Sequence, residues 1–166
     1  MKVITVSGVS GTGKTTLSKK LAKKLNFYYF DVNNFIQKNK LYEGIDKKRR
    51  TKIVDVKKLN KSLIIEIKKL KNAGKYKGII IDSHLSHYLP KKYVDFCIVT
   101  KCAIQVLNKR LKRKGFHKSK IQENLQAEIF DICHNEAVEL KHKVIVLDAT
   151  KSFNISSVVR MLVAEC

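Results

Sequence analysis

Eight residues near the start of the chain have the types and spacing of a loop that encloses phosphate groups. The run from Gly8 to Thr15 (GVSGTGKT) fits the pattern GxxxxGK[ST] at every fixed position. Its glycines, Gly11 and Gly13 among them, permit the positive φ angles that turn successive backbone N–H groups inward as an anion nest. Lys14 adds a mobile positive charge for the β- and γ-phosphates, and the hydroxyl of Thr15 is a ligand for Mg²⁺. The pattern therefore predicts a site for ATP and Mg²⁺.

The loop stands between a predicted strand and a predicted helix, which is the context in which this pattern binds phosphate. Residues 2–6 (KVITV) predict a short buried strand, and apolar residues at helical spacing predict a helix from Lys14 to Leu25. The positive end of that helix dipole points at the phosphates, so Thr16 in the first turn joins the expected ATP-binding residues. A glycine-rich turn without a ligand is the alternative interpretation.

Asp82 ends an apolar strand, at a position where a phosphate-loop enzyme needs an acid. Residues 78–82 (GIIID) predict a fully buried strand, and an acid at such a strand end holds Mg²⁺ or its water shell. His84 follows two residues later, so its side chain leaves the strand end in a similar direction. An imidazole there positions a water molecule or relays a proton. Alternatively, Asp82 caps a turn and His84 is an exposed loop histidine. Position alone assigns no role to the other histidines, His87, His117, His134 and His142.

Alternating strands and helices position these residues. Strands are predicted at 2–6, 27–30, 78–82, 95–100 and 143–147, and helices at 14–25, 55–72, 103–114, 119–139 and 153–164. Residues 31–50 are polar and weakly periodic and predict a small mobile insertion. Strands that alternate with helices of this length indicate right-handed βαβ units around a parallel sheet, the α/β class.

Length and composition bound the remaining possibilities. The 166 residues suit one domain with a real core, and no apolar run is long enough to cross a bilayer. No signal-peptide pattern precedes the glycine-rich loop, so we expect a cytoplasmic protein, or a nuclear one in a eukaryote. The four cysteines lack CxxC spacing and are expected to be free thiols: Cys97, Cys102, Cys133 and Cys166.

A net charge of +21, from 35 Lys and Arg against 14 Asp and Glu, attracts polyanions, with RNA as the obvious candidate. Lysine pairs recur along the predicted helices, so solvated helix faces explain the same charge equally well. Charge alone does not choose between these two interpretations.

The phosphate loop, the run 81–84 (IDSH) and the segments 109–116 (KRLKRKGF) and 120–130 (KIQENLQAEIF) together resemble one family. The two later segments resemble the lid and post-lid helix of adenylate kinase isoenzyme 6, a family of ribosome-assembly adenylate kinases and nuclear ATPases with archaeal members. The resemblance extends from Val3 to about Lys151.

The resemblance implies the fold of a nucleoside monophosphate kinase, a P-loop NTPase with a five-stranded parallel sheet flanked by helices. It implies a monophosphate-binding insertion near residues 31–54 and a short lid near 112–122. Arg113 matches the ATP-contacting lid arginine, with Arg110 as a second candidate, and Lys151 matches an adenine-side contact. Asp82 and His84 match the family's Asp-x-His pair, so we expect Lys14, Asp82, His84 and Arg113 to carry catalysis.

The resemblance also implies Mg²⁺-dependent ATP hydrolysis, transfer to AMP or another nucleoside monophosphate, and binding of a ribosomal protein from the small-subunit platform. One departure bears on the acceptor. Gln37 stands where the family has an arginine that clamps the acceptor phosphate, and Lys38 or Lys40 is the expected substitute. Three classes therefore stay open: a monophosphate kinase, an ATPase switch in ribosome assembly, and a non-enzymatic module that binds RNA or protein.

Overall fold

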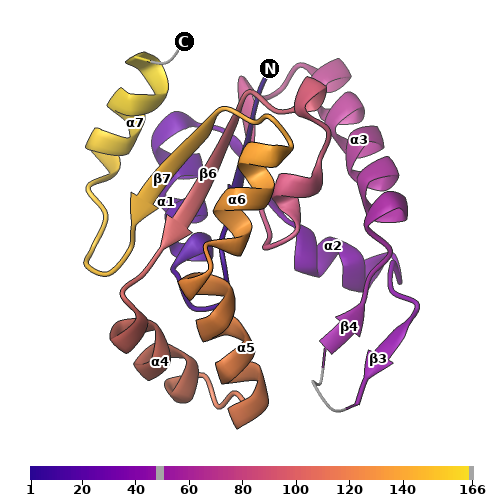
Figure 1. Cartoon of the computed structure of the whole chain (residues 1–166). Helices are drawn as coiled ribbons and strands as arrows, with labels where there is room; N and C mark the ends of the chain where they lie inside the picture. Colours follow the sequence, from indigo (N-terminus) through magenta and orange to yellow (C-terminus); the bar gives the residue numbers. More distant parts are fainter. Residues whose placement is uncertain (48–50, 165–166) are drawn as a thin grey trace.

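The expected parallel sheet of five strands is confirmed. A computed structural model describes residues 1–47 and 51–164. The strands lie in the order β2-β5-β1-β6-β7, all parallel, and are β1 (Lys2–Ser7), β2 (Tyr28–Asp31), β5 (Gly78–Asp82), β6 (Phe96–Lys101) and β7 (Val144–Asp148) (Figure 1). Helices cover both faces of the three central strands, which explains why β1, β5 and β6 read as continuous apolar runs rather than as alternating patterns.

Helices surround the sheet. They are α1 (Lys14–Leu25), α2 (Val32–Lys38), α3 (Val56–Ala73), α4 (Ile104–Arg113), α5 (Lys118–Ile129), α6 (Ile132–Glu139) and α7 (Ile155–Ala164), with short 3-10 helices η1 (Ser86–Tyr88) and η2 (Lys91–Tyr93). The apolar stripes of α1 and α7 pack on one face, against Ile4, Val6 and Ile98. Those of α2 and α3 pack on the other face, against Val3 and Ile79.

Local signals fix the ends of these helices. The carboxylate of Asp55 accepts hydrogen bonds from the backbone N–H groups of Lys57 and Lys58, which caps the start of α3. Gly74, at φ 64°, ends the same helix in the left-handed conformation that favours glycine.

The structure corrects two boundary predictions. The helix expected over 119–139 is two helices, because Asp131 adopts φ 55° between α5 and α6 and forms an ion pair with Lys101 on β6. The last helix begins at Ile155 rather than at Phe153.

The insertion predicted near residues 31–54 contains regular secondary structure in its described part. It holds α2 and a two-stranded antiparallel sheet, β3 (Gly44–Asp46) and β4 (Thr51–Ile53). Residues 48–50 of this predicted insertion lie outside the described residues, as does Cys166. The described cysteines, Cys97, Cys102 and Cys133, are free thiols.

The carboxyl ends of the five strands gather at one end of the molecule, where the glycine-rich loop lies. The start of β1 and the end of α7 lie at the opposite end (Figure 1). Among the described residues, we find no helix with the length and apolar character needed to span a membrane.

Candidate functional site

The glycines of the phosphate loop adopt conformations that few other residues tolerate. Gly8, Gly11 and Gly13 have φ angles of 134°, 92° and 92°. A Cβ atom on Gly8 would lie 2.5 Å from the carbonyl oxygen of Thr100, and one on Gly11 would lie 2.9 Å from Cδ1 of Leu107. The loop therefore needs glycine both for its backbone angles and for its close packing on β6 and α4.

Lys14 begins α1 with its ammonium group folded back over the loop. Its Nζ donates a hydrogen bond of 2.8 Å to the carbonyl oxygen of Val9. Burial lowers the pKa of Lys14 to about 8, and the nearby carboxylate of Asp82 opposes that shift. Lys14 is partly accessible and lines the cleft in front of the loop, so a phosphate group bound there could replace the Val9 carbonyl as the partner of the ammonium.

Asp82 lies beside the phosphate loop because β5 pairs with β1, so that Asp82 is opposite Val6. It is 4% exposed, and its Oδ2 accepts a hydrogen bond of 2.9 Å from the hydroxyl of Tyr29. Burial and the Asp82 carboxylate raise the pKa of Tyr29, while a hydrogen bond to the Thr15 side chain opposes that shift. Tyr29, which the sequence did not single out, therefore lies between Asp82 and Thr15, the two predicted Mg²⁺ ligands.

All ten site residues predicted from the sequence line one cleft of about 690 Å³. They are Gly11, Gly13, Lys14, Thr15, Thr16, Asp82, His84, Arg110, Arg113 and Lys151. They come from four places in the chain: the phosphate loop with α1, the end of β5, the end of α4 and the connection from β7 to α7. We call this space the phosphate-loop cleft.

The guanidinium of Arg110 ties two of those segments together. Its Nη1 donates to the carbonyl oxygen of Gly11 at 3.5 Å, and its Nη2 donates to that of Thr150 at 3.2 Å. Phe153 lines the same cleft and lies close behind the loop, since a Cβ on Gly13 would be 3.5 Å from its ring. Sequence patterns did not indicate Phe153, because a single aromatic residue before an apolar helix resembles an ordinary core position.

A second cleft of about 740 Å³ adjoins the first, and we call it the acceptor-side cleft because residues of the expected monophosphate-binding insertion line it. Its walls come from α2 and β4, from η1, and from α5 and α6. Ser10, Asn33 and His84 line both clefts, so these three residues mark the place where the two spaces meet.

The acceptor-side cleft contains Gln37, whose side-chain oxygen accepts a hydrogen bond of 3.3 Å from Nζ of Lys52. Lys38 and Lys40, the substitute cations expected from the sequence, are exposed and line neither cleft, so their role stays a prediction. Among the described residues that line the acceptor-side cleft, Lys52 and Lys120 supply the positive charge.

His84 keeps more than a third of its surface accessible, but that surface opens into the two clefts. Burial by the surrounding protein, with a smaller contribution from the ammonium of Lys14, lowers the pKa of His84 to about 4. At neutral pH the ring is therefore an uncharged imidazole, which can both donate and accept a hydrogen bond.

His87, to which the sequence assigned no role, is a buried histidine with both ring nitrogens hydrogen-bonded. Nδ1 lies 2.6 Å from the hydroxyl of Ser7, and Nε2 lies 2.9 Å from a carboxylate oxygen of Glu136. Ser7 precedes the phosphate loop and Glu136 lines the acceptor-side cleft. No local pattern could have found this arrangement, because its partners are 80 and 49 positions away.

A parallel five-stranded sheet, a glycine-rich phosphate loop after its first strand and an acid at the end of the neighbouring strand define a P-loop protein of the kinase type. Residues 4–131, more than half of the chain, match the family model described as the AAA domain. The chain is 37% identical over 147 residues to a Methanocaldococcus jannaschii protein named "Putative adenylate kinase", covering 89% of this chain and 76% of that one.

The chain is also 34% identical over 166 residues to "Adenylate kinase isoenzyme 6 homolog FAP7" of Saccharomyces cerevisiae, covering 98% of this chain and 81% of that protein. It belongs to the adenylate kinase isoenzyme 6 family.

Solved structures share the fold at low sequence identity. A deoxyadenosine kinase from M. mycoides with bound dATP superposes with a TM-score of 0.58 at 19% identity, over 98% of this chain and 99% of that one. A shikimate kinase from Acinetobacter baumannii in complex with shikimate gives 0.62 at 12% identity, over 99% and 94%. These likenesses support the kinase fold.

Proposed function

We propose that this protein is an adenylate kinase-like phosphotransferase that moves the γ-phosphoryl group of Mg·ATP to a nucleoside monophosphate, with AMP as the first candidate (ATP + AMP = 2 ADP). The observation that supports this most directly is the pair of adjoining clefts. One is lined by the phosphate loop, and the other meets it at Ser10, Asn33 and His84. Phosphoryl transfer needs two substrates held in line more than it needs covalent catalysis, and adjoining clefts provide that positioning.

In this mechanism the backbone N–H groups of the loop and the ammonium of Lys14 hold the β- and γ-phosphates. Arg113, with Arg110 in support, stabilises the negative charge that develops on the transferred group. Thr16 and Lys151 complete the ATP contacts. The described parts of the insertion, 31–47 and 51–54, close over the acceptor, and the lid at 112–122 closes over ATP.

The donor set fits Mg²⁺. Thr15 and Asp82 offer a hydroxyl and a carboxylate oxygen, which are the hard ligands that this ion prefers, and Tyr29 lies between them. Among the described residues no group of three or more His, Cys, Asp or Glu side chains could hold a metal alone. This agrees with an ion that takes its other ligands from phosphate and water. Bound Mg²⁺ would neutralise charge on the β- and γ-phosphates.

His84 is placed to orient the acceptor phosphate or an attacking water molecule, because it lines both clefts and is uncharged at neutral pH. This role needs a hydrogen bond of fixed direction, which the neutral imidazole provides in either tautomer.

The decisive experiment follows ADP formation from Mg·ATP with and without AMP. AMP-dependent ADP formation that is abolished by Lys14→Met supports the phosphotransferase. A Lys24→Met variant serves as the control, since Lys24 is exposed on the same helix and lines neither cleft. Turnover by Lys14→Met at the parent rate would overturn the assignment.

A second candidate is an ATPase without significant transfer to a monophosphate, and Gln37 is the observation that favours it. Gln37 lies in the acceptor-side cleft beside Lys52, and neither side chain makes the bidentate fork with which an arginine holds phosphate. This activity would be identified by release of inorganic phosphate from ATP at a rate that does not change when AMP or another nucleoside monophosphate is added.

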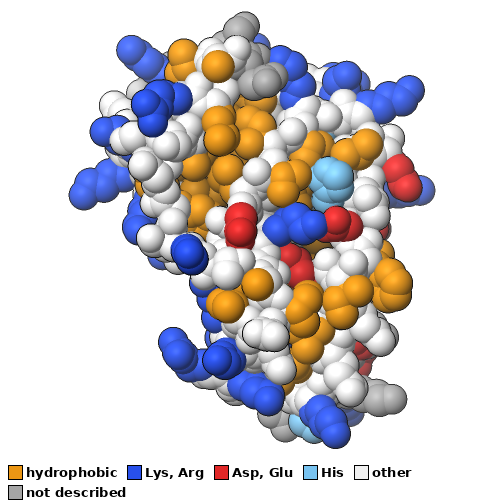
Figure 2. All heavy atoms as spheres, turned by 60° about the vertical axis from the view of Figure 1, so that its left-hand side comes forward, with side chains coloured by type: hydrophobic (Ala, Val, Ile, Leu, Met, Phe, Trp, Pro, Cys, Tyr) orange, Lys and Arg blue, Asp and Glu red, His pale blue; other side chains and the backbone are white. Residues whose placement is uncertain are grey.

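We also propose a role in small ribosomal subunit maturation, through a platform ribosomal protein and RNA. Membership of the family and the net charge of +21 support it. On the face shown in Figure 2, Lys and Arg side chains outnumber acidic ones. RNA affinity should fall steeply as salt rises if phosphate contacts dominate, and a flat salt dependence would contradict RNA binding.

A further inference from the structure

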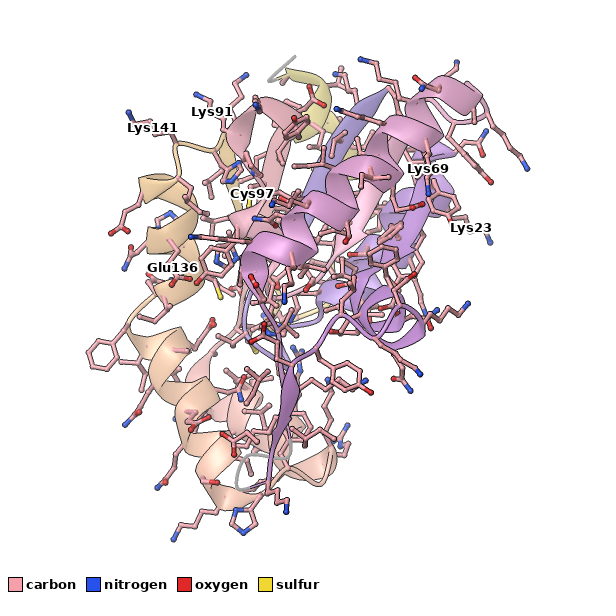
Figure 3. All side chains as sticks on the ribbon, turned by 90° about the vertical axis from the view of Figure 1, so that its right-hand side faces the viewer. Lys23, Lys69, Lys91, Cys97, Glu136 and Lys141 are labelled. Carbon is pink, nitrogen blue, oxygen red and sulfur yellow. The ribbon has the colours of Figure 1, made fainter. Side chains whose placement is uncertain are left out.

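Three side chains form a continuous hydrogen-bonded line from the acceptor-side cleft to the residue before the phosphate loop. Glu136 stands on α6 (Figure 3), with its side chain 33% exposed and its Oε2 2.9 Å from Nε2 of His87. Nδ1 of His87 is 2.6 Å from Oγ of Ser7, and both of these residues are buried. Oγ of Ser7 is also 3.4 Å from the carbonyl oxygen of His84. We call Glu136, His87 and Ser7 the relay.

The chemistry of the groups fixes where the protons lie. A carboxylate only accepts, so Nε2 of His87 carries the proton that points to Glu136. Burial lowers the pKa of His87, although Glu136 opposes that shift, so the ring is neutral and Nδ1 accepts from the Ser7 hydroxyl. The single proton of Ser7 therefore points to Nδ1 of His87 at 2.6 Å and not to the carbonyl oxygen of His84 at 3.4 Å. The direction of the two hydrogen bonds between Glu136, His87 and Ser7 follows from Glu136.

Glu136 is itself held in place. The hydroxyl of Tyr88 donates to its Oε1 at 2.8 Å, and the ring of Tyr88 lies against that of His87 with centroids 4.2 Å apart. Each carboxylate oxygen has a further lone pair, and the side chain, which is 33% exposed, lines the acceptor-side cleft. A carboxylate in that cleft repels a phosphate, so its open side suits the N–H or O–H donors of the nucleoside part of an acceptor.

We propose that Glu136, His87 and Ser7 are positioning residues for phosphoryl transfer, through which an acceptor nucleoside that donates a hydrogen bond to Glu136 fixes Ser7 and with it the start of the phosphate loop. The inference rests on the proposed phosphotransferase function. It adds that the acceptor is recognised at its nucleoside end by a carboxylate, and that this recognition reaches the residue that precedes the phosphate loop.

The substitution Glu136→Gln tests the relay with little change of shape. The amide oxygen of the glutamine can still accept a hydrogen bond from either His87 or Tyr88, but the amide nitrogen donates where the carboxylate accepted. The substitution therefore changes which atoms of the relay donate and which accept. We expect kcat with the acceptor to fall about tenfold and KM for the acceptor to rise, while KM for ATP changes less than about twofold. Glu139→Gln is the control, because Glu139 is exposed on the same helix and lines neither cleft.

Ser7→Ala tests the other end of the relay. Its matched control is Ser18→Ala, since Ser18 is also a buried serine and its hydroxyl has no hydrogen-bond partner among the described residues. If one relay carries the effect, the double variant Ser7→Ala/Glu136→Gln has about the same kcat as the worse single variant. A purely structural role would lower the melting temperature and leave kcat of the folded protein near the parent value.

The relay and the proposed function fail differently. If the parent protein forms ADP from ATP and AMP but Ser7→Ala and Glu136→Gln both match it in kcat, the relay is refuted and the phosphotransferase stands. Kinetic effects that multiply in the double variant also refute the relay. If the parent protein shows no transfer to any nucleoside monophosphate, the proposed function itself fails.

Discussion

Lys14 is predicted to destabilise the unliganded fold, and replacing it with methionine measures by how much. One pKa unit corresponds to about 1.4 kcal/mol, so lowering the pKa of Lys14 from 10.5 to about 8 costs roughly 3 kcal/mol. Because part of the side chain remains accessible, we expect Lys14→Met to raise the free energy of unfolding by about 2 kcal/mol at pH 7.

The pH dependence of this effect has a definite sign. Below pH 8 Lys14 is protonated in both the folded and the unfolded protein, and the full cost of burying the charge is present. Between about 8 and 10.5 the unfolded chain binds more protons at this position than the folded protein, so the stability of the parent rises with pH. The advantage of Lys14→Met should therefore shrink across this window and be lost above it.

Urea denaturation of the two proteins at pH 7 and pH 10, without nucleotide, measures both quantities. Lys24→Met is the control, and its free energy of unfolding should differ from the parent by less than about 1 kcal/mol at either pH. Mg·ATP should raise the melting temperature of the parent and not that of Lys14→Met. A Lys14→Met protein that is no more stable than the parent at pH 7 would refute the reasoning.

Three further predictions concern the loop, the acid and the acceptor. Gly8→Ala should lower the free energy of unfolding by ~3 kcal/mol. Gly8 has a φ angle of 134°, and a Cβ atom on it would lie 2.5 Å from a backbone carbonyl oxygen of β6. Gly74 has a φ angle of 64° and open space around it, so Gly74→Ala should lower the free energy of unfolding by only ~1 kcal/mol. If urea denaturation showed the same loss for Gly8→Ala and Gly74→Ala, this account would be contradicted. Asp82→Asn should lower kcat at least about 100-fold, with the melting temperature nearly unchanged because an amide oxygen still accepts from Tyr29; activity close to the parent's would exclude Asp82 from the site. Gln37→Arg should lower KM for AMP about tenfold through a bidentate contact with phosphate, and an unchanged KM would place the acceptor phosphate elsewhere.

The sheet, the phosphate loop and Asp82 could be predicted because each depends on local sequence. A buried parallel strand is a short apolar run, and the loop needs glycine and lysine at fixed positions. The sequence put Asp82 at a strand end, and the structure adds that β5 pairs with β1 in parallel, which brings Asp82 beside the loop. The resemblance to a family then supplied Arg113 and Lys151, which no local rule would have joined to the loop.

The remaining features depend on contacts between distant residues. Apolar spacing continues across Asp131, but the left-handed conformation of this residue and its ion pair with Lys101 divide the predicted helix. Aspartate is among the few residues that adopt this conformation readily, so the break had only a weak local signal. Similarly, β3 and β4 contribute few apolar residues to the core and escaped a search for periodicity.

The opposite placement of the chain ends and the clefts has a practical consequence. Met1 directly precedes β1, and both it and the end of α7 lie far from the carboxyl ends of the strands (Figure 1). A tag, fluorophore or solid support joined near either end would therefore leave both clefts facing the solution. Binding of nucleotides to the immobilised protein can be followed by surface-based methods.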